Sequence, residues 1–230
     1  MDEKSDVEAH RHIVEEIKER FGLNLSVDEL LEKYTKCAER AYNEFVRNPI
    51  PGREYYEITF EYLLSDVGVN FTKDDIIWCG ECWKRNHAKY VRLYPDVRET
   101  LIRLKNLGMH IGLITDANRS YIEMQLEALK IRYLFDSITT VSDAGAEKPD
   151  KKIFLHALES AGVSPNEAVM VGDLLTKDIV GAKSVGMTAV LLLREPSRVY
   201  EVLRRAPIEP DFIVHDLYQL VDVVTTILMR

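Results

Sequence analysis

The sequence predicts an α/β protein in two parts: a small four-helix domain over residues 1–92 and a doubly wound parallel sheet over residues 93–230. In the first part, apolar residues recur at the three- and four-residue spacing of amphipathic helices. In the second part, short and fully apolar segments alternate with helical stretches, which is typical of parallel strands covered by helices on both faces. Apolar residues make up 46% of the 230, enough to bury a real core.

Four helices are expected in the first part. Serine-x-x-glutamate sequences at residues 5–8 and 26–29 have the pattern of capping boxes and open the first two. A glycine ends the first helix and two prolines end the second. Short loops between four helices suggest a small bundle. The helices are predicted from Ser5 to Gly22, from Ser26 to about Pro49 and Pro51, over Tyr55–Leu64, and over Lys73–Tyr90, with Gly68 before the last.

In the second part, a helix capped by Asp96 and ending at Gly108 precedes the first strand. In parallel sheets of this kind, ligands bind at the carboxyl ends of the strands, so the residues just after strands are the candidates for chemistry. The elements that follow are predicted as a strand at 111–115, a helix at 119–130, a strand at 137–141, a helix at 151–161, a strand at 168–171, a helix at 177–185, strands at 188–193 and 212–214, and a C-terminal helix.

Composition and charge argue against several classes of protein. The net charge of −8 argues against non-specific nucleic-acid binding. The sequence shows neither a signal peptide nor an apolar run long enough to cross a membrane, so a cytoplasmic protein is expected, without membrane partners. It also contains neither a P-loop nor a dinucleotide-binding glycine pattern.

Cys79 and Cys82 have the spacing of a redox or metal motif, but they lie in an aromatic, helix-like stretch. A structural zinc needs about four ligands, which would require His87 and the distant Cys37 as well. Two cysteines that share one face of a helix are the simpler interpretation. Histidines at positions 10, 12, 87, 110, 156 and 215 are scattered, and we interpret them as structural or surface residues.

Polar residues follow three of the predicted strands. Thr115 could hold a phosphate oxygen, although a threonine at a strand end is often only a turn residue. Lys148, before a proline, could place a positive charge over a transferring group, or could be an ordinary surface lysine. Asp173 and Asp178 straddle a helix start and would suit Mg²⁺, whereas a single aspartate there would be explained by helix capping.

These sequences together resemble the haloacid-dehalogenase superfamily, and the resemblance runs from about residue 92 to 216. It implies that residues 93–230 form the superfamily's α/β core and that residues 1–92 form its small helical cap domain. The matching motifs are Leu134–Ser142, Glu147–Asp150, Ile153–Phe154, Val171–Asp173, Asp178–Lys183 and Gly186–Met187.

The resemblance implies a Mg²⁺-dependent phosphatase that acts on a small phosphorylated substrate. In this superfamily an aspartate of a D-x-D motif attacks the phosphate ester, and water then cleaves the aspartyl-phosphate. By motif, Thr115 would contact the phosphoryl oxygens and Lys148 would balance their charge. Asp173 would bind Mg²⁺, while Asp178 would support Lys148 or the metal site. Thr115, Asp116, Asn118 and Lys148 are the substrate contacts that the resemblance implies.

Two departures from the superfamily pattern matter. Asp116 stands where asparagine is more usual, which adds negative charge near a phosphate site. More seriously, no D-x-D sequence occurs, and the first core strand is apparently missing. That strand would lie between those at 111–115 and 168–171, so the sheet would either expose two apolar edges or close the gap.

Several interpretations therefore stay open. Met1 could be an internal methionine of a longer phosphatase, or the chain could be a non-enzyme that keeps a phosphate and metal half-site for binding or regulation. A 2-haloacid dehalogenase would need no metal. An interaction module would assemble through its helical part. A monomer or a homodimer is expected.

Overall fold

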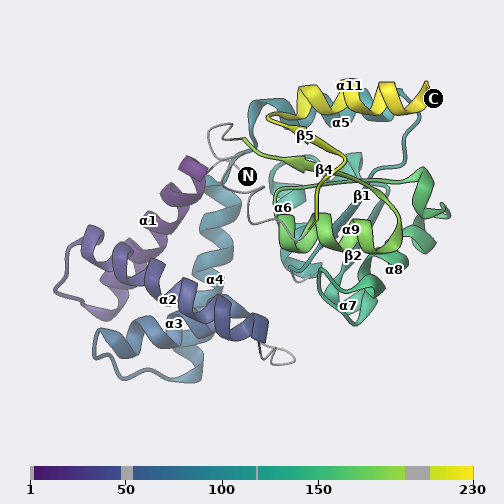
Figure 1. Cartoon of the computed structure of the whole chain (residues 1–230). Coiled ribbons are helices and arrows are strands. Elements are labelled where there is room, and N and C mark those ends of the chain that lie inside the picture. The colour runs from purple at the N-terminus through teal and green to yellow at the C-terminus, as the bar shows by residue number, and fades with distance from the viewer. Residues whose placement is uncertain (1–2, 48–53, 118, 195–207, 230) are drawn as a thin grey trace. The chain divides into compact units, whose positions relative to one another are not determined.

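The computed structural model describes residues 3–47, 54–117, 119–194 and 208–229 (Figure 1). The chain divides into two compact units, Met1–Leu93 and Tyr94–Arg230, and each is described by itself. No helix among the described residues combines the length and apolar character needed to cross a bilayer.

The first unit consists of helices α1 (Glu3–Phe21), α2 (Val27–Arg47), α3 (Tyr55–Asp66) and α4 (Lys73–Tyr90). The capping box at the start of α2 is confirmed: Ser26 N donates to Glu29 Oε2 (2.8 Å), and Glu29 N donates to Ser26 Oγ (3.2 Å). The predicted box at Ser5 is wrong. Ser5 lies inside α1, and its buried hydroxyl accepts a hydrogen bond from Arg92 N (2.9 Å). Pro49 and Pro51 lie outside the described residues.

Both cysteines of the Cys79–Cys82 pair are buried in the core of the helical unit as free thiols. Burial raises the pKa of each to about 12, so both stay protonated at neutral pH. A protonated thiol is a poor nucleophile. Among the described residues, neither cysteine belongs to a group of three potential metal ligands. The structure therefore favours the simpler interpretation, in which these cysteines pack in the core.

The second unit alternates helices and strands, which confirms the predicted doubly wound α/β architecture. Its elements are α5 (Pro95–Asn106), β1 (Gly112–Thr115), α6 (Arg119–Ala128), β2 (Ser137–Thr140), α7 (Val141–Ala144), α8 (Lys151–Ala161), β3 (Val169–Gly172), a π-helical turn (Leu175–Ile179) continuing into α9 (Val180–Val185), β4 (Thr188–Leu192), β5 (Phe212–Val214) and α11 (Leu217–Leu228).

The strands form two separate parallel sheets. β1 pairs with β2 from Gly112↔Ser137 to Thr115↔Thr140, and β3, β4 and β5 pair in that order. Within the described residues, β1 and β3 form no ladder with each other. Among the described residues, β1 and β3 thus each pair with one strand only, and the sequence predicted a further strand between them.

Helices cover both faces of the larger sheet. On one face, β4 packs Ala189 and Leu191 against α8 and α9, in a cluster with Ile153, Phe154 and Ile179. On the other face, Val190 and Val214 pack against Leu220 and Val224 of α11. Figure 1 shows α5 and α11 running side by side. Since successive side chains of a strand point to opposite faces, an all-apolar strand needs both coverings.

Asp96 joins α5 to α11 and is not the N-cap that the sequence predicted, because Tyr94 occupies that position. Its carboxylate is 4% exposed. It accepts two hydrogen bonds from Arg194 (3.0 and 3.1 Å) and one from Leu217 N (2.7 Å). Burial would raise the pKa of Asp96, but the bonds from Arg194 and Leu217 outweigh that effect and lower it.

Replacing Asp96 by alanine is expected to lower the free energy of unfolding by about 2–3 kcal/mol, because a buried N–H and a guanidinium lose their acceptor. Urea denaturation measures the effect. Asp216→Ala is the matched control: it removes only the N-cap bond to Gln219 N (2.8 Å) of α11 and should cost about 1 kcal/mol. Equal losses in the two variants would contradict the role assigned to Asp96.

Candidate active site

Four charged side chains meet where β1 and β3 end. Asp116 follows β1 and Lys148 lies in the loop before α8, while Lys177 and Asp178 belong to the π-helical turn after β3. The contacts are Lys148 Nζ to Asp178 Oδ1 (2.7 Å), Lys148 N to Asp116 Oδ1 (2.9 Å) and Lys177 Nζ to Asp116 Oδ2 (2.8 Å). The structure thus brings three of the predicted site residues together, and Lys177 with them.

Lys148 is held in a nearly dry setting. Its side chain is 12% exposed and that of Asp178 is 3% exposed. The second oxygen of Asp178 accepts a hydrogen bond from Leu174 N (3.0 Å), so both oxygens of this carboxylate are engaged within the protein. A charge pair of this kind has little water to screen it. Asp178 therefore fixes the position of the Lys148 ammonium group.

Gly172, the last residue of β3, makes room for Asp178. A Cβ atom built on Gly172 would lie 2.3 Å from the Asp178 Cβ and Oδ2 atoms, far inside van der Waals contact. Only glycine permits this close approach of strand and turn. Glycine at position 172 thus has a steric reason, independent of any resemblance.

Asp116 does not leave a free negative charge at the site, as its sequence position suggested it would. Both its oxygens accept hydrogen bonds, one from the backbone of Lys148 and one from the Lys177 ammonium. Asp116 therefore ties the Lys148 loop to the end of β1. Lys177 was missed by sequence reasoning, because a lysine in a helix start carries no signal of a partner 61 positions away.

The other predicted site residues lie at the same strand ends. Thr115 is half-buried at the end of β1, and its Oγ1 accepts a hydrogen bond from Ala117 N (3.1 Å), which leaves its O–H as a donor. Asp173 directly follows β3 and is exposed. An exposed carboxylate at a strand end suits a hard, oxygen-preferring cation such as Mg²⁺. Asn118 lies outside the described residues.

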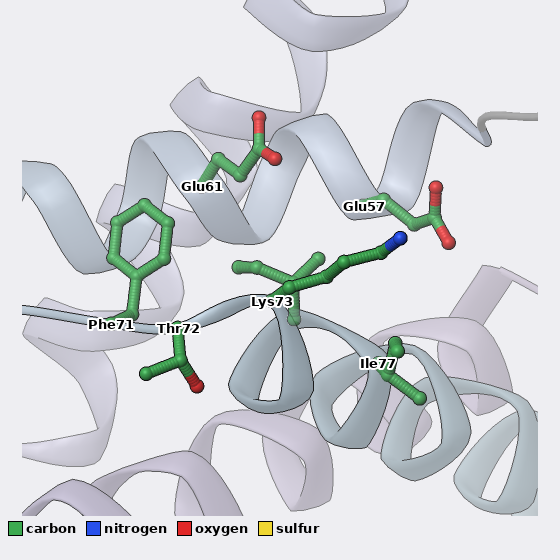
Figure 2. Close-up of a pocket in the computed structure, with 7 residues that line it drawn as sticks. Glu57, Glu61, Phe71, Thr72, Lys73 and Ile77 are labelled. Carbon is green, nitrogen blue, oxygen red and sulfur yellow. The ribbon is translucent and has the colours of Figure 1, made fainter.

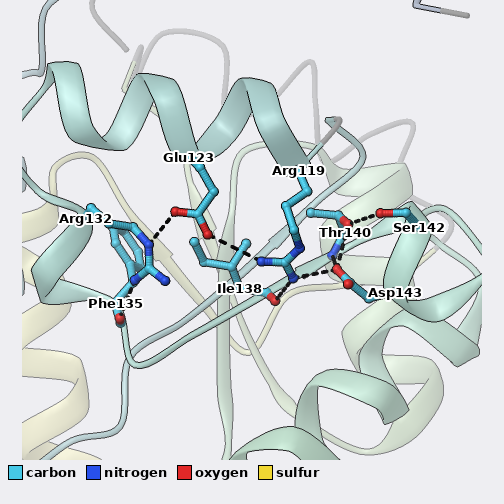
Figure 3. A network of polar contacts seen from close by, with 8 residues as sticks. All are labelled: Arg119, Glu123, Arg132, Phe135, Ile138, Thr140, Ser142 and Asp143. Atoms are coloured by element: carbon cyan, nitrogen blue, oxygen red, sulfur yellow. Dashed lines mark hydrogen bonds and ion pairs between the residues drawn. The ribbon is translucent and has the colours of Figure 1, made fainter. Parts of the chain in front are cut away.

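A second polar network braces the neighbouring strand β2 (Figure 3). Arg119 of α6 donates to Ile138 O and to Asp143 Oδ2, both at 2.7 Å. Thr140 donates to the same Asp143 oxygen through its N (2.8 Å) and its Oγ1 (2.6 Å). One turn further along α6, Glu123 pairs with both Arg119 (3.4 Å) and Arg132 (2.5 Å). The network fixes the carboxyl end of β2, from which the chain leads to Lys148.

This network makes stability depend on pH. Burial alone would raise the pKa of Asp143, but hydrogen bonds from Arg119 and Thr140 outweigh it and lower the pKa from 3.8 to about 2. The stabilisation is therefore complete above about pH 4 and is lost as the pH falls towards 2. The side chain is 25% exposed, so we expect about 1 kcal/mol after screening. Denaturation of the wild type and Asp143→Asn at pH 6 and pH 2.5 checks this: their difference should shrink at the lower pH, and a constant difference would contradict it.

The helical unit has a pocket of its own, of about 420 Å³, between α3 and the start of α4. In Figure 2, Glu57 and Glu61 of α3 lie across from Lys73 and Ile77 of α4. Two carboxylates against one ammonium group give the pocket an acidic balance, which does not suit a phosphate group. This pocket is therefore a poor candidate for binding a phosphate group.

Comparison with known proteins agrees with this geometry. The profile of the haloacid dehalogenase-like hydrolases matches residues 27–192. The glyceraldehyde 3-phosphate phosphatase of Methanopyrus kandleri is 31% identical over 220 residues, covering 86% of this chain and 94% of the relative. That of Pyrococcus furiosus is 31% identical over 185 residues, covering 80% and 76%.

Solved structures show the same fold. A HAD phosphatase from Thermococcus onnurineus is 26% identical, with a TM-score of 0.65 over 96% of this chain and 91% of its own. The HAD-hydrolase YfnB from Bacillus subtilis, bound to magnesium, gives a TM-score of 0.75 at 17% identity over 94% and 91%. Fold, family profile and relatives agree: this chain belongs to the haloacid dehalogenase-like hydrolase family.

Proposed function

We propose that this chain provides the phosphate- and Mg²⁺-binding side of a phosphatase site that acts on a small phosphorylated metabolite. The observation that carries the proposal is the nearly dry Lys148–Asp178 pair, which holds a fixed ammonium group at the meeting point of two strand ends. Fixed positive charge in such a place stabilises charge on a transferring phosphoryl group. The relatives that are glyceraldehyde 3-phosphate phosphatases support a three-carbon phosphate ester as the first substrate to test.

Each residue has a distinct role in this proposal. The Thr115 hydroxyl donates to a phosphoryl oxygen, and Lys148 neutralises the phosphoryl charge. Asp178 and Asp116 position Lys148 through its ammonium and its backbone N–H. Asp173 holds Mg²⁺, which when bound neutralises phosphoryl charge and orients the group. We place Asn118 beside the substrate from its motif position alone.

The nucleophile is the part that these 230 residues do not supply as a D-x-D motif. We propose that it belongs on a strand seated between β1 and β3, each of which pairs with only one other strand in the described part of the chain. Without such a strand, the chain would bind phosphate but would hydrolyse little of a phosphorylated substrate. We also propose that the protein works in the cytoplasm as a monomer or homodimer, with neither nucleic acid nor membrane as a partner.

Two experiments test the proposal. In the first, inorganic phosphate with MgCl₂ should raise the melting temperature of the chain as it is, and Lys148→Met should abolish the increase. In the second, an apolar strand ending in Asp-x-Asp-x-Thr is fused before Met1, and phosphate release from glyceraldehyde 3-phosphate is measured. We expect kcat/KM to rise by roughly 10³-fold or more over a fusion whose first aspartate is asparagine.

The outcomes separate the open alternatives. Equal activity of the aspartate and asparagine fusions, in proteins that both melt cooperatively, would refute the phosphatase proposal. Phosphate binding that is unchanged in Lys148→Met would refute the assigned site. Chloride release from 2-chloropropionate without Mg²⁺ would favour a dehalogenase instead.

A further inference from the structure

A group of three metal-ligating side chains lies in the helical unit, away from the site described above. Asp6 Oδ1 lies 3.4 Å from His87 Nε2, and Asp6 Oδ2 lies 3.7 Å from His10 Nδ1. One donor atom from each residue falls within 4.8 Å of the other two. Within the described parts of the chain, no other histidine, cysteine or carboxylate residues form such a group of three.

The fold builds this cluster from two helices that pack together, α1 and α4. Asp6 and His10 are four residues apart on α1, so both side chains project from the same face. His87 comes from the last turn of α4. The two helices lie at opposite ends of the first unit's sequence, which is why the sequence alone suggested only scattered histidines.

The ring of His87 is oriented in the way that a metal-binding histidine requires. Its Nδ1 lies 2.9 Å from the carbonyl oxygen of Trp83, and a carbonyl only accepts, so Nδ1 carries the hydrogen. The ring therefore directs Nε2 towards Asp6. Metal-bound histidines usually hold their second nitrogen in this way. Trp83 also packs on the ring, with centroids 4.0 Å apart, and the His10 ring meets it edge-on at 5.0 Å.

Exposure increases across the cluster from one side to the other. The His87 side chain is 2% exposed, His10 24% and Asp6 36%. An ion bound here would be buried on the His87 side and open to solvent on the Asp6 side. It could enter from the open side, where a water molecule could complete its coordination. In a tetrahedral site with ligand bonds of about 2.0–2.2 Å the donors lie roughly 3.4 Å apart, so a pair separated by as much as 4.8 Å would have to draw together by up to about 1.4 Å.

We propose that Asp6, His10 and His87 bind one zinc ion, with a solvent molecule as the fourth ligand. The ion would then link α1 to α4. Two imidazoles and a carboxylate are a donor set that zinc accepts readily, whereas Mg²⁺ prefers oxygen ligands. The ion would stabilise the helical unit by mass action, because it binds only the folded arrangement. The site is independent of the proposed phosphatase function.

The test is a titration of the metal-free 230-residue chain with ZnCl₂, followed by calorimetry and by melting temperature, with MgCl₂ in parallel. We expect one zinc per chain, a melting temperature that rises with zinc and no equivalent effect of magnesium. Asp6→Asn, which is nearly isosteric and lies on the open side, should weaken zinc binding by roughly 100-fold. Co²⁺ in place of zinc should give visible absorption typical of four or five ligands, including nitrogen, and Asp6→Asn should change it.

Two control variants change neighbouring side chains of the helical unit and should not affect zinc binding. His12→Gln alters the neighbouring His12–Glu15 pair (3.0 Å) on the same helix and should leave zinc binding unchanged. Cys79→Ser with Cys82→Ser should also leave it unchanged. Absence of saturable zinc binding, equal binding in Asp6→Asn, or loss of binding in the His12 or cysteine variants would each overturn the proposal and leave the cluster as a hydrogen-bonded polar contact.

Discussion

Asp178→Ala is expected to lower the free energy of unfolding of the second unit by about 3–5 kcal/mol. The side chain is 3% exposed and is the ion-pair partner of Lys148, which is itself only 12% exposed. Removing it leaves a lysine ammonium group nearly dry and unpaired, and it removes the acceptor of Leu174 N. Urea denaturation followed by far-ultraviolet circular dichroism measures the loss. Tryptophan fluorescence would not report on the second unit, because both tryptophans lie in the first unit.

Two further variants separate charge from packing. Asp178→Asn keeps the shape and one acceptor oxygen, and should cost distinctly less than the alanine variant. In Lys148→Met/Asp178→Leu both charges are gone, and most of the lost stability should return, because a buried pair can be replaced by apolar groups at little cost. A double variant as unstable as Asp178→Ala would show that the unpaired Lys148 charge is not the cause.

Gly172→Ala is the second substitution with a large expected effect, about 3 kcal/mol or more. The added methyl group would lie 2.3 Å from Asp178 atoms, so either β3 or the turn must move, and the Lys148 contact moves with it. In an Asp178→Gly background the side chain that the new methyl group would meet is absent. The loss of unfolding free energy caused by Gly172→Ala should then fall by at least half.

Gly181→Ala gives the comparison. Its methyl group would lie 2.1 Å from the buried Phe154 ring, and Asp178 is not among the nearest atoms that it would meet. It should also destabilise the protein, but its penalty should be the same in the wild-type and in the Asp178→Gly background. A Gly172→Ala penalty that likewise does not change between the two backgrounds would show that the close approach of Gly172 and Asp178 is not its cause.

Local patterns predicted the elements well and their non-local contacts poorly. The serine-x-x-glutamate pattern was correct at Ser26, where both partners lie within one turn of helix. The same pattern failed at Ser5, whose hydroxyl accepts from Arg92 N, 87 positions away. Asp96 also looked like a helix cap, and it instead joins Arg194 and Leu217, 98 and 121 positions away. A short polar side chain fits a cap and a long-range anchor equally well, and only packing distinguishes them.

In the candidate site, too, local patterns predicted which residues take part, and non-local contacts were missed. Strand ends located Thr115, Lys148 and Asp173, because parallel strands bring their carboxyl ends to one edge. The charge balance could not be predicted, since it depends on Lys177 reaching Asp116 from another loop. The π-helical turn at Leu175–Ile179, predicted as part of an ordinary helix, is what brings Lys177 and Asp178 into place.

The link from α5 to α11 through Asp96 also limits how soon the protein can finish folding while it is being made. Asp96 and Leu217 are 121 positions apart, so a ribosome adding about 5–20 residues per second reaches the start of α11 roughly 6–24 s after it adds Asp96. Until then the Asp96 carboxylate has no partner from α11, and once β4 has been made, the apolar face formed by Val190 lacks its α11 cover. The second unit therefore completes its fold only after α11 has been made, and until then the Val190 face of β4 stays uncovered.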